Sequence, residues 1–301
     1  MKSTYRISEE SAKIFYQCAD EFVCNSPVRP ERFMKVMKEN TGVAGTVFGV
    51  VTKDGLEKRN PVIVALGDSV TAGHFEGLLS EDTFKFFQDA YSPLSEGGTM
   101  ADVGRKIEEL GGLPVMEVTD AKESYVEKFR DKLIDKYETT SVSIINAGIA
   151  GDFLPSMAAR AERDVVCHNP DLILINGSLN WDDDKMGDGN AYKQILLKLV
   201  RDLKEKTNAD IILLTPNGDT PNDLFSDLGI PAIEPTTAKR CEKIREVAVE
   251  ENVCLADVRA VWDMAREKGL DWKELLANHV NHPSVEGHEV YARVLMKLFE
   301  D

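Results

Sequence analysis

The sequence predicts a doubly wound α/β fold, a three-layer α/β/α sandwich in which helices cover both faces of a central parallel sheet. Two observations predict it. Short apolar runs alternate along the chain with longer segments of helical spacing. The runs also lack the polar–apolar alternation of half-exposed strands, so both faces of each strand should be covered. The 301 residues, 43% of them hydrophobic, suffice for one large domain or two small ones.

The elements alternate regularly after residue 61. The predicted strands are VIVAL (62–66), VSII (142–145), LILI (172–175), IILL (211–214) and VCLA (253–256). The predicted helices are 124–137, 154–167, 191–206, 237–251 and a last one over 284–299. Right-handed crossovers then place the carboxyl ends of the strands at one edge, where such folds bind ligands.

The first sixty residues are predicted to form an extension, 1–60, packed on the main domain, 61–301. Hydrophobic spacing indicates a helix over 8–24, and a second one begins at Pro30 and stops near Gly42. TVFGVVT (46–52), an Asp-Gly turn signal and LEK (56–58) then indicate a strand pair. Residues 80–123 are expected to be an insertion over one rim of the sheet.

Composition excludes several classes of partner and site. Acidic residues outnumber basic ones 52 to 36, and the net charge of −16 disfavours nucleic acids and anionic membranes. The five cysteines are scattered without a CxxC pair, which argues for reduced, mostly buried thiols and against a disulfide framework or a zinc site. With no signal peptide pattern and no apolar membrane span, we expect a cytoplasmic protein without a metal or other cofactor.

The first central strand ends in Gly67-Asp68-Ser69, which places a serine hydroxyl at the ligand-binding edge. Gly67 permits a tight turn, and Asp68 can hydrogen-bond local backbone donors. Taken alone, this serine fits a helix cap better than a nucleophile.

Polar residues after two later strands and before the last helix favour the nucleophile. Asn-Ala-Gly-Ile-Ala-Gly-Asp (146–152) and Asn-Gly-Ser-Leu-Asn-Trp-Asp (176–182) follow two other strands, and Asn281-His282-Pro283 precedes the last helix. A hydroxyl, oxyanion donors and an imidazole therefore converge on one edge.

These blocks resemble the GDSL or SGNH hydrolases. The four motifs of that family look like GDSVTAG (67–73), NAGIAGD (146–152), NGSLNWD (176–182) and HVNHPSVEGH (279–288), in the family's order. The resemblance spans 62–299 and implies a flavodoxin-like fold and serine hydrolase activity on carboxylic esters.

The resemblance also implies a role for each matched residue. Ser69 is expected to be the nucleophile and His282 the base, while the N–H groups of Ser69 and Gly151 and the amide of Asn180 form the oxyanion hole. Asn180 is chosen over Asn176 because Asn176 should lie within its strand. An imidazole is needed because a serine hydroxyl is a weak nucleophile near neutral pH.

The group that orients His282 is left open. The family usually carries an aspartate three residues before the histidine, where this chain has His279. Either a backbone carbonyl near His279 holds the ring, or a carboxylate such as Asp257 or Glu286 does, or this member is slow or inactive. Asp68 and His279 are accordingly expected as supporting residues.

Other conspicuous residues have structural interpretations. His288 is expected at a helix N-terminus, Asp152 as a loop-bracing acceptor, and the acidic run 182–184 as an exposed loop, because its spacing does not fit a calcium loop. Trp181 suits the core and the acyl pocket equally.

The sequence thus predicts a short-chain acyl esterase, plausibly an acetyl esterase, acting on a small-molecule ester such as an acylated sugar. The alternatives are a lysophospholipase or thioesterase with the same machinery, and a ligand-binding member that has lost turnover. The oligomeric state, the natural substrate and the acyl-chain length are not determined by the sequence.

Overall fold

The computed structural model of the 301-residue chain describes residues 6–40, 46–47, 50–51, 60–76, 81–112, 117–139, 142–181, 183–221 and 235–300. A five-stranded parallel sheet with the order β6-β3-β7-β8-β9 forms its centre. The strands are β3 (Val62–Gly67), β6 (Ser143–Gly148), β7 (Leu172–Asn176), β8 (Asp210–Leu214) and β9 (Cys254–Ala256). In chain order this is the 2-1-3-4-5 arrangement of flavodoxin-like folds, and the predicted fold class is confirmed.

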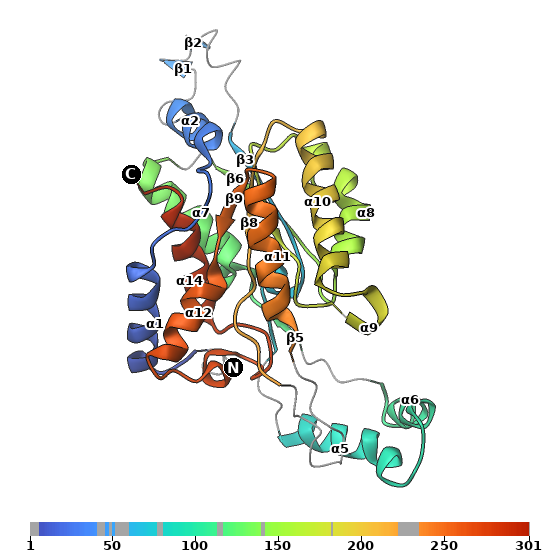
Figure 1. Cartoon of the computed structure of the whole chain (residues 1–301). Helices are drawn as coiled ribbons and strands as arrows, with labels where there is room; N and C mark the ends of the chain where they lie inside the picture. Colours follow the sequence, from blue (N-terminus) through green and yellow to red (C-terminus); the bar gives the residue numbers. More distant parts are fainter. Residues whose placement is uncertain are drawn as a thin grey trace.

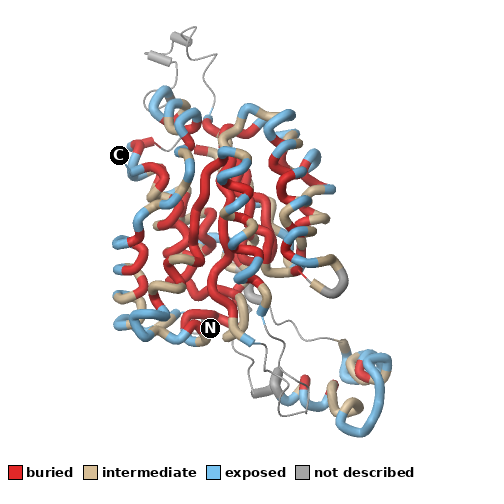
Figure 2. Tube along the Cα trace, viewed as in Figure 1, coloured by how far each residue is buried: buried red, intermediate tan, exposed pale blue. Residues whose placement is uncertain are grey.

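Helices cover the two faces of the sheet (Figure 1). One face carries α1 (Glu9–Glu21), α2 (Glu31–Asn40), α7 (Tyr125–Tyr137), α12 (Val258–Glu267) and α14 (Val285–Lys297). The other carries α8 (Leu154–Asp164), α10 (Gly189–Lys206) and α11 (Thr237–Glu250). Successive residues of a strand alternate between the two cores, as in β3, where Ile63 belongs to the first and Val64 to the second. Figure 2 shows strands buried between helices whose outer surfaces are exposed, while the edge strand β6 is only partly buried.

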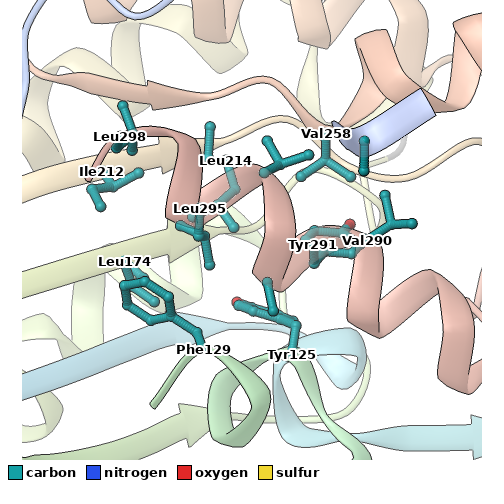
Figure 3. Packing of buried hydrophobic residues seen from close by; sticks show 14 of the residues in the cluster. Tyr125, Phe129, Leu174, Ile212, Leu214, Val258, Val290, Tyr291, Leu295 and Leu298 are labelled. Atoms are coloured by element: carbon teal, nitrogen blue, oxygen red, sulfur yellow. The ribbon is translucent and has the colours of Figure 1, made fainter. Parts of the chain in front are cut away.

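The larger core lies between α14 and the sheet (Figure 3). Tyr125 and Phe129 of α7 meet Tyr291 and Leu295 of α14 there, and all four are fully buried. The predicted extension contributes to the same core through Phe15 of α1 and its neighbours. The division of the chain into an extension, 1–60, and a main domain, 61–301, stays a prediction.

The prediction for TVFGVVT is wrong. We expected one strand over 46–52 that pairs with 56–58, but β1 (Thr46–Val47) pairs with β2 (Val50–Val51) in antiparallel register. The expected turn at 54–55 and the run 56–58 lie outside the described residues.

The region 80–123 contains more regular structure than we predicted. Its elements are α5 (Glu81–Ser95), α6 (Met100–Glu109), β5 (Glu117–Thr119) and a short 3₁₀ helix, η2 (Ala121–Glu123). β5 pairs with β4 (His74–Glu76), just beyond the carboxyl end of β3. Figure 1 shows α5 and α6 packed on each other and set apart from the sandwich. Further short helices are α4 (Ser69–Ala72), η3 (Val166–His168), α9 (Asp183–Met186) and α13 (Trp272–Leu275).

The carboxyl end of β6 lies against α4 at Gly148. A Cβ there would lie 2.3 Å from the backbone nitrogen of Ala72, and backbone cannot rotate away as a side chain can. We therefore expect Gly148→Ala to lower the free energy of unfolding by about 1–3 kcal/mol, the usual cost of overpacking.

Gly104 provides the control for that experiment. It lies exposed inside α6 with nothing within 4 Å of a built Cβ, and Gly104→Ala should stabilise the protein by up to about 1 kcal/mol through helix propensity. Chemical denaturation of both variants measures these changes. A Gly148→Ala variant as stable as the wild type would contradict the close approach of β6 to α4.

Candidate active site

The site forms where the strand order reverses around β3. Gly67, the last residue of β3, pairs in register with Gly148 of β6 and Asn176 of β7. The three chain segments that follow carry Ser69, Gly151 and Asn180. The chain goes from β3 to β6 on one side of β3 and then crosses to β7 on its other side. The connecting helices therefore lie on opposite faces of the sheet and leave an opening between them at this edge.

Ser69 is the first residue of α4, a four-residue helix that begins directly after β3. Asp68 caps this helix, because its Oδ1 accepts the backbone N–H of Val70 at 3.0 Å. The turn ends at Gly73, whose φ of 84° lies in the left-handed region that favours glycine. The sharp turn presents the Ser69 side chain, of which only a small part is exposed, at the carboxyl edge.

His282 meets this serine from the opposite end of the chain. The distance from Ser69 Oγ to His282 Nε2 is 2.9 Å, across 213 residues of sequence. His282 is 4% exposed and lies just before α14, whose N-cap Ser284 accepts the N–H of Gly287 at 3.1 Å. For the serine to donate this hydrogen bond, the imidazole must carry its own proton on Nδ1.

Neither carboxylate considered for His282 is directed at it. Both oxygens of Asp257 accept hydrogen bonds from Arg245, and Asn25 and Thr215 also donate to them. The Glu286 oxygens accept from the Arg6 guanidinium and the N–H of Ile7. His279 adopts a φ of 58°, and its backbone carbonyl accepts the Thr220 hydroxyl at 2.6 Å.

Two of the three predicted oxyanion donors, Gly151 and Asn180, lie on adjoining loops, and the third is the N–H of Ser69 in α4. Gly151 has a φ of 70°, which suits glycine at the tip of the loop after β6. Asn180 Nδ2 donates to the Asp152 carbonyl at 3.0 Å, which ties the loop after β7 to the loop that carries Gly151. An amide nitrogen has two hydrogens. One N–H of Asn180 thus fixes the two loops relative to each other.

Arg160 of α8 was not anticipated from the sequence and connects these loops. Its Nη2 donates to the Gly67 carbonyl at 3.0 Å and its Nη1 to the Ala147 carbonyl at 2.8 Å. Its Nε binds the Asp152 carboxylate at 2.7 Å, and Asp164 provides a second carboxylate at 2.8 Å. Arg160 and Asp152 are both buried, so a single guanidinium holds the strand ends that precede Ser69 and Gly151.

A second buried arginine holds the loop after β7. Arg240 of α11 donates from Nε to the Ser178 carbonyl at 2.8 Å, two residues before Asn180. Trp181 is buried, donates from Nε1 to the Gly187 carbonyl and packs edge-on against Tyr192. Trp181 therefore belongs to the core of this face.

His288 is structural, as expected. Its Nδ1 accepts the N–H of Tyr125 at 3.1 Å, and its ring contacts Phe75 and Tyr125. Burial, with smaller contributions from Lys128 and His282, lowers the pKa of His288 to about 3. This imidazole is therefore neutral near pH 7 and already accepts a hydrogen bond.

Asp68 makes stability depend on pH. Burial, to which the neighbouring charge of Asp152 adds, raises the pKa of this carboxyl from 3.8 to about 7. Between these pH values the unfolded chain loses its proton while the folded chain keeps it, so rising pH favours the unfolded state; below 3.8 and above 7 the contribution is constant. Asp68→Asn, which keeps the oxygen that caps α4, should therefore flatten the fall in unfolding free energy between pH 4 and 7.

The control for this titration is Asp188, the exposed cap of α10, whose pKa is lowered by the N–H groups of Ala191 and Asn190. Its stabilisation is present above its unfolded pKa and is lost as the pH falls, so Asp188→Asn should change the curve in the opposite sense. Denaturant titrations that run from pH 7 to below 3.8, the unfolded value of both carboxyls, measure both effects. Identical slopes for wild type and Asp68→Asn would refute the effect.

Two further properties concern metals and membranes. The described residues contain no group of three or more His, Cys, Asp or Glu side chains placed to hold a metal ion. Within the same residues, no helix combines the length and the apolar character needed to cross a bilayer.

Comparison with known proteins identifies the family of this chain. The profile of the GDSL-like lipase/acylhydrolase family matches residues 65–290, most of the chain. An acetylxylan esterase of Geobacillus stearothermophilus is 24% identical over 173 residues, which cover 54% of this chain and 74% of the relative.

Solved structures show the same fold. The acetylxylan esterase structure from Geobacillus stearothermophilus has a TM-score of 0.53 at 21% identity, over 81% of this chain and 96% of that one. A putative GDSL-like lipase from Parabacteroides merdae has a TM-score of 0.55 at 20% identity, over 80% and 96%. The family resemblance predicted from the four blocks is confirmed: the chain belongs to the GDSL-like lipase/acylhydrolase family, a family of carboxylic ester hydrolases.

Proposed function

We propose that this chain is a serine esterase that removes a short acyl group, acetyl above all, from a hydroxyl of a carbohydrate or small metabolite. The observation that carries the proposal is the 2.9 Å contact between Ser69 Oγ and His282 Nε2, at the edge where the strand order reverses. The acetylxylan esterase relative supports acetyl as the acyl group and a sugar as the alcohol.

The reaction begins with attack of Ser69 Oγ on the ester carbonyl carbon, while His282 Nε2 takes the hydroxyl proton. The carbonyl oxygen becomes an oxyanion, and the N–H groups of Ser69 and Gly151 with the second N–H of Asn180 are its proposed donors. Each donor that is fixed before the reaction contributes roughly 3–4 kcal/mol to the transition state.

The tetrahedral intermediate collapses when the bond to the alcohol oxygen breaks and His282 Nε2–H gives that oxygen its proton. The products of this half-reaction are the free alcohol and an acyl-Ser69. Water then attacks the acyl carbon with His282 again as base, which releases the carboxylic acid and restores the serine hydroxyl.

A fluorophosphonate probe tests the mechanism. We expect stoichiometric labelling of the wild-type protein at Ser69, identified by the mass of the modified peptide, because the probe needs an activated serine. Labelling at another serine, or none, would contradict the proposal. The second result would favour a ligand-binding member without turnover.

The acyl preference is tested with p-nitrophenyl esters of increasing chain length and with acetylated xylo-oligosaccharides. We expect kcat/KM to be highest for acetate and to fall with length. Activity that instead rises with acyl length would favour a lysophospholipase or thioesterase.

A further inference from the structure

The loop that delivers His282, residues 276–283 and here called the base loop, is shaped by an amide side chain. Asn278 Oδ1 accepts three consecutive backbone N–H groups, those of Val280 at 3.0 Å and of Asn281 and His282 at 2.9 Å. His279, which lies between Asn278 and Val280 in the sequence, takes a positive φ. A side-chain oxygen that caps three donors fixes the path of the main chain up to His282.

The rest of the protein holds this loop through Asn217, which follows β8. Asn217 is fully buried, and its Nδ2 donates to the Asn281 carbonyl at 2.8 Å. That carbonyl belongs to the peptide bond whose nitrogen is the backbone nitrogen of His282. Thr220, on the same segment, donates its N–H to the Val280 carbonyl at 2.9 Å.

Tyr291 of α14 fixes Asn217 in turn. The Tyr291 hydroxyl donates to Asn217 Oδ1 at 2.9 Å and accepts the backbone N–H of Asn217 at 2.8 Å. Two bonds to one hydroxyl set the orientation of the Asn217 amide, and with it which end of the amide faces the base loop.

The chain of contacts continues to the nucleophile. The Tyr291 ring stacks on Tyr125 with a centroid distance of 4.9 Å and an interplanar angle of 21°, and Figure 3 shows the two rings side by side. The Tyr125 hydroxyl pairs with Thr71 Oγ1 at 2.9 Å, in the same short helix as Ser69. Thr71, Tyr125, Asn217 and Tyr291 are all fully buried. The helix that begins with Ser69 and the loop that carries His282 thus share one buried network.

We propose that Asn217 and Tyr291 are positioning residues that place the His282 imidazole on Ser69 by holding the main chain of the base loop. The inference rests on the proposed roles of Ser69 and His282. In this family an aspartate usually orients the imidazole, and this chain has His279 at that position. The inference assigns part of this orienting role to the buried amide–phenol pair of Asn217 and Tyr291. Unpaired buried polar groups are costly, so removal of either partner should displace the other.

Tyr291→Phe is the decisive variant, because it keeps the stacked ring and removes only the hydroxyl. We expect the rate of fluorophosphonate labelling and kcat for p-nitrophenyl acetate to fall about five- to tenfold with KM unchanged, the effect of one misplaced buried hydrogen bond. For an alkyl acetate the loss should be larger, because the alkoxide leaves only with a proton from His282, whereas p-nitrophenolate leaves without one. A purely structural role would not produce this dependence on the leaving group.

Asn217→Ala should cause a similar loss, and the double variant should lose little more, since both changes release the same loop. Tyr16→Phe is the control: it removes the hydroxyl of a tyrosine on α1, whose ring lies under the Arg293 guanidinium of α14, and should match the wild type. Crystal structures of wild type and Tyr291→Phe should show a Ser69 Oγ to His282 Nε2 separation that lengthens beyond hydrogen-bond distance in the variant.

The outcomes separate this inference from the proposed function. If the wild type is labelled at Ser69 but Tyr291→Phe reacts at the wild-type rate, or the two losses are additive, the inference is overturned and the esterase mechanism stands. If the wild type is not labelled at all, the mechanism fails, and the crystallographic separation in Tyr291→Phe alone decides whether this pair positions His282.

Discussion

Replacing Ser69 with alanine is expected to lower kcat for p-nitrophenyl acetate by roughly five to six orders of magnitude, the loss seen when the nucleophile of such a unit is removed. The reason is that the variant lacks the oxygen that lies 2.9 Å from His282 Nε2, and with it the proposed nucleophile. The residual rate should exceed that in water, because the oxyanion donors remain. Steady-state kinetics with a burst-phase assay measures the change.

Two comparisons make this result specific. His282→Ala should cost nearly as much, and the double variant little more, because the two groups act as one unit. Among the described residues, the Ser69 hydroxyl hydrogen-bonds to one side chain, that of His282, so the unfolding temperature should change little. Substantial esterase activity in Ser69→Ala would sink the assignment of the nucleophile.

Arg160 carries the second large effect, on stability and activity together. Arg160→Met leaves the Asp152 carboxylate buried without its cation, and breaking such a pair costs about 3–5 kcal/mol. Because the Gly67 and Ala147 carbonyls also lose their donor, the loops that carry Ser69 and Gly151 should loosen. We expect kcat to fall by roughly 10²-fold, the effect of a misplaced oxyanion donor.

Arg160→Lys separates the two contributions. Lysine keeps the charge for Asp152, but a single ammonium cannot span the separated acceptors that a planar guanidinium reaches. Stability should therefore recover in part while kcat stays low. Arg245→Lys is the control, since Arg245 also binds a buried carboxylate, Asp257, through two nitrogens but touches none of the site loops. Chemical denaturation and kcat are measured for Arg160→Met, Arg160→Lys and Arg245→Lys. Equal kcat values for Arg160→Lys and Arg245→Lys would contradict this role of Arg160.

Apart from His282, which precedes the last helix, the parts of the site that were predicted from sequence follow strands. A strand buried on both faces is uniformly apolar, so its end is visible as an abrupt change to polar residues, and Ser69 and Asn180 stand at such changes. The strands β3, β6, β7, β8 and β9 were predicted on the same signal, with ends that differ by a few residues. The expected burial on both faces is wrong for β6, which lies at the edge of the sheet and is only partly buried.

The supporting residues left no such signal. Arg160 and Arg240 lie within amphipathic helices, where an arginine is usually exposed, and their partners are backbone carbonyls of other segments. A carbonyl is present at every residue, so no pattern reveals which one will accept. The sequence does show Arg160 and Asp164 at i,i+4 spacing, but an ordinary ion pair on a helix surface has the same spacing. Helix α12 was missed as well, because its apolar spacing directly follows β9 without a break.

The sequence by itself determined the fold class, the family and the order in which the proposed nucleophile, oxyanion donors and base occur, since apolar periodicity and short motifs are local properties. Only the tertiary structure decided what surrounds them: that Asp257 and Glu286 bind other partners, that Arg160 joins two strand ends, and that Asn217 and Tyr291 reach the base loop. These contacts join segments tens to hundreds of residues apart. Their geometry depends on how the helices pack across the sheet, which the local pattern does not encode.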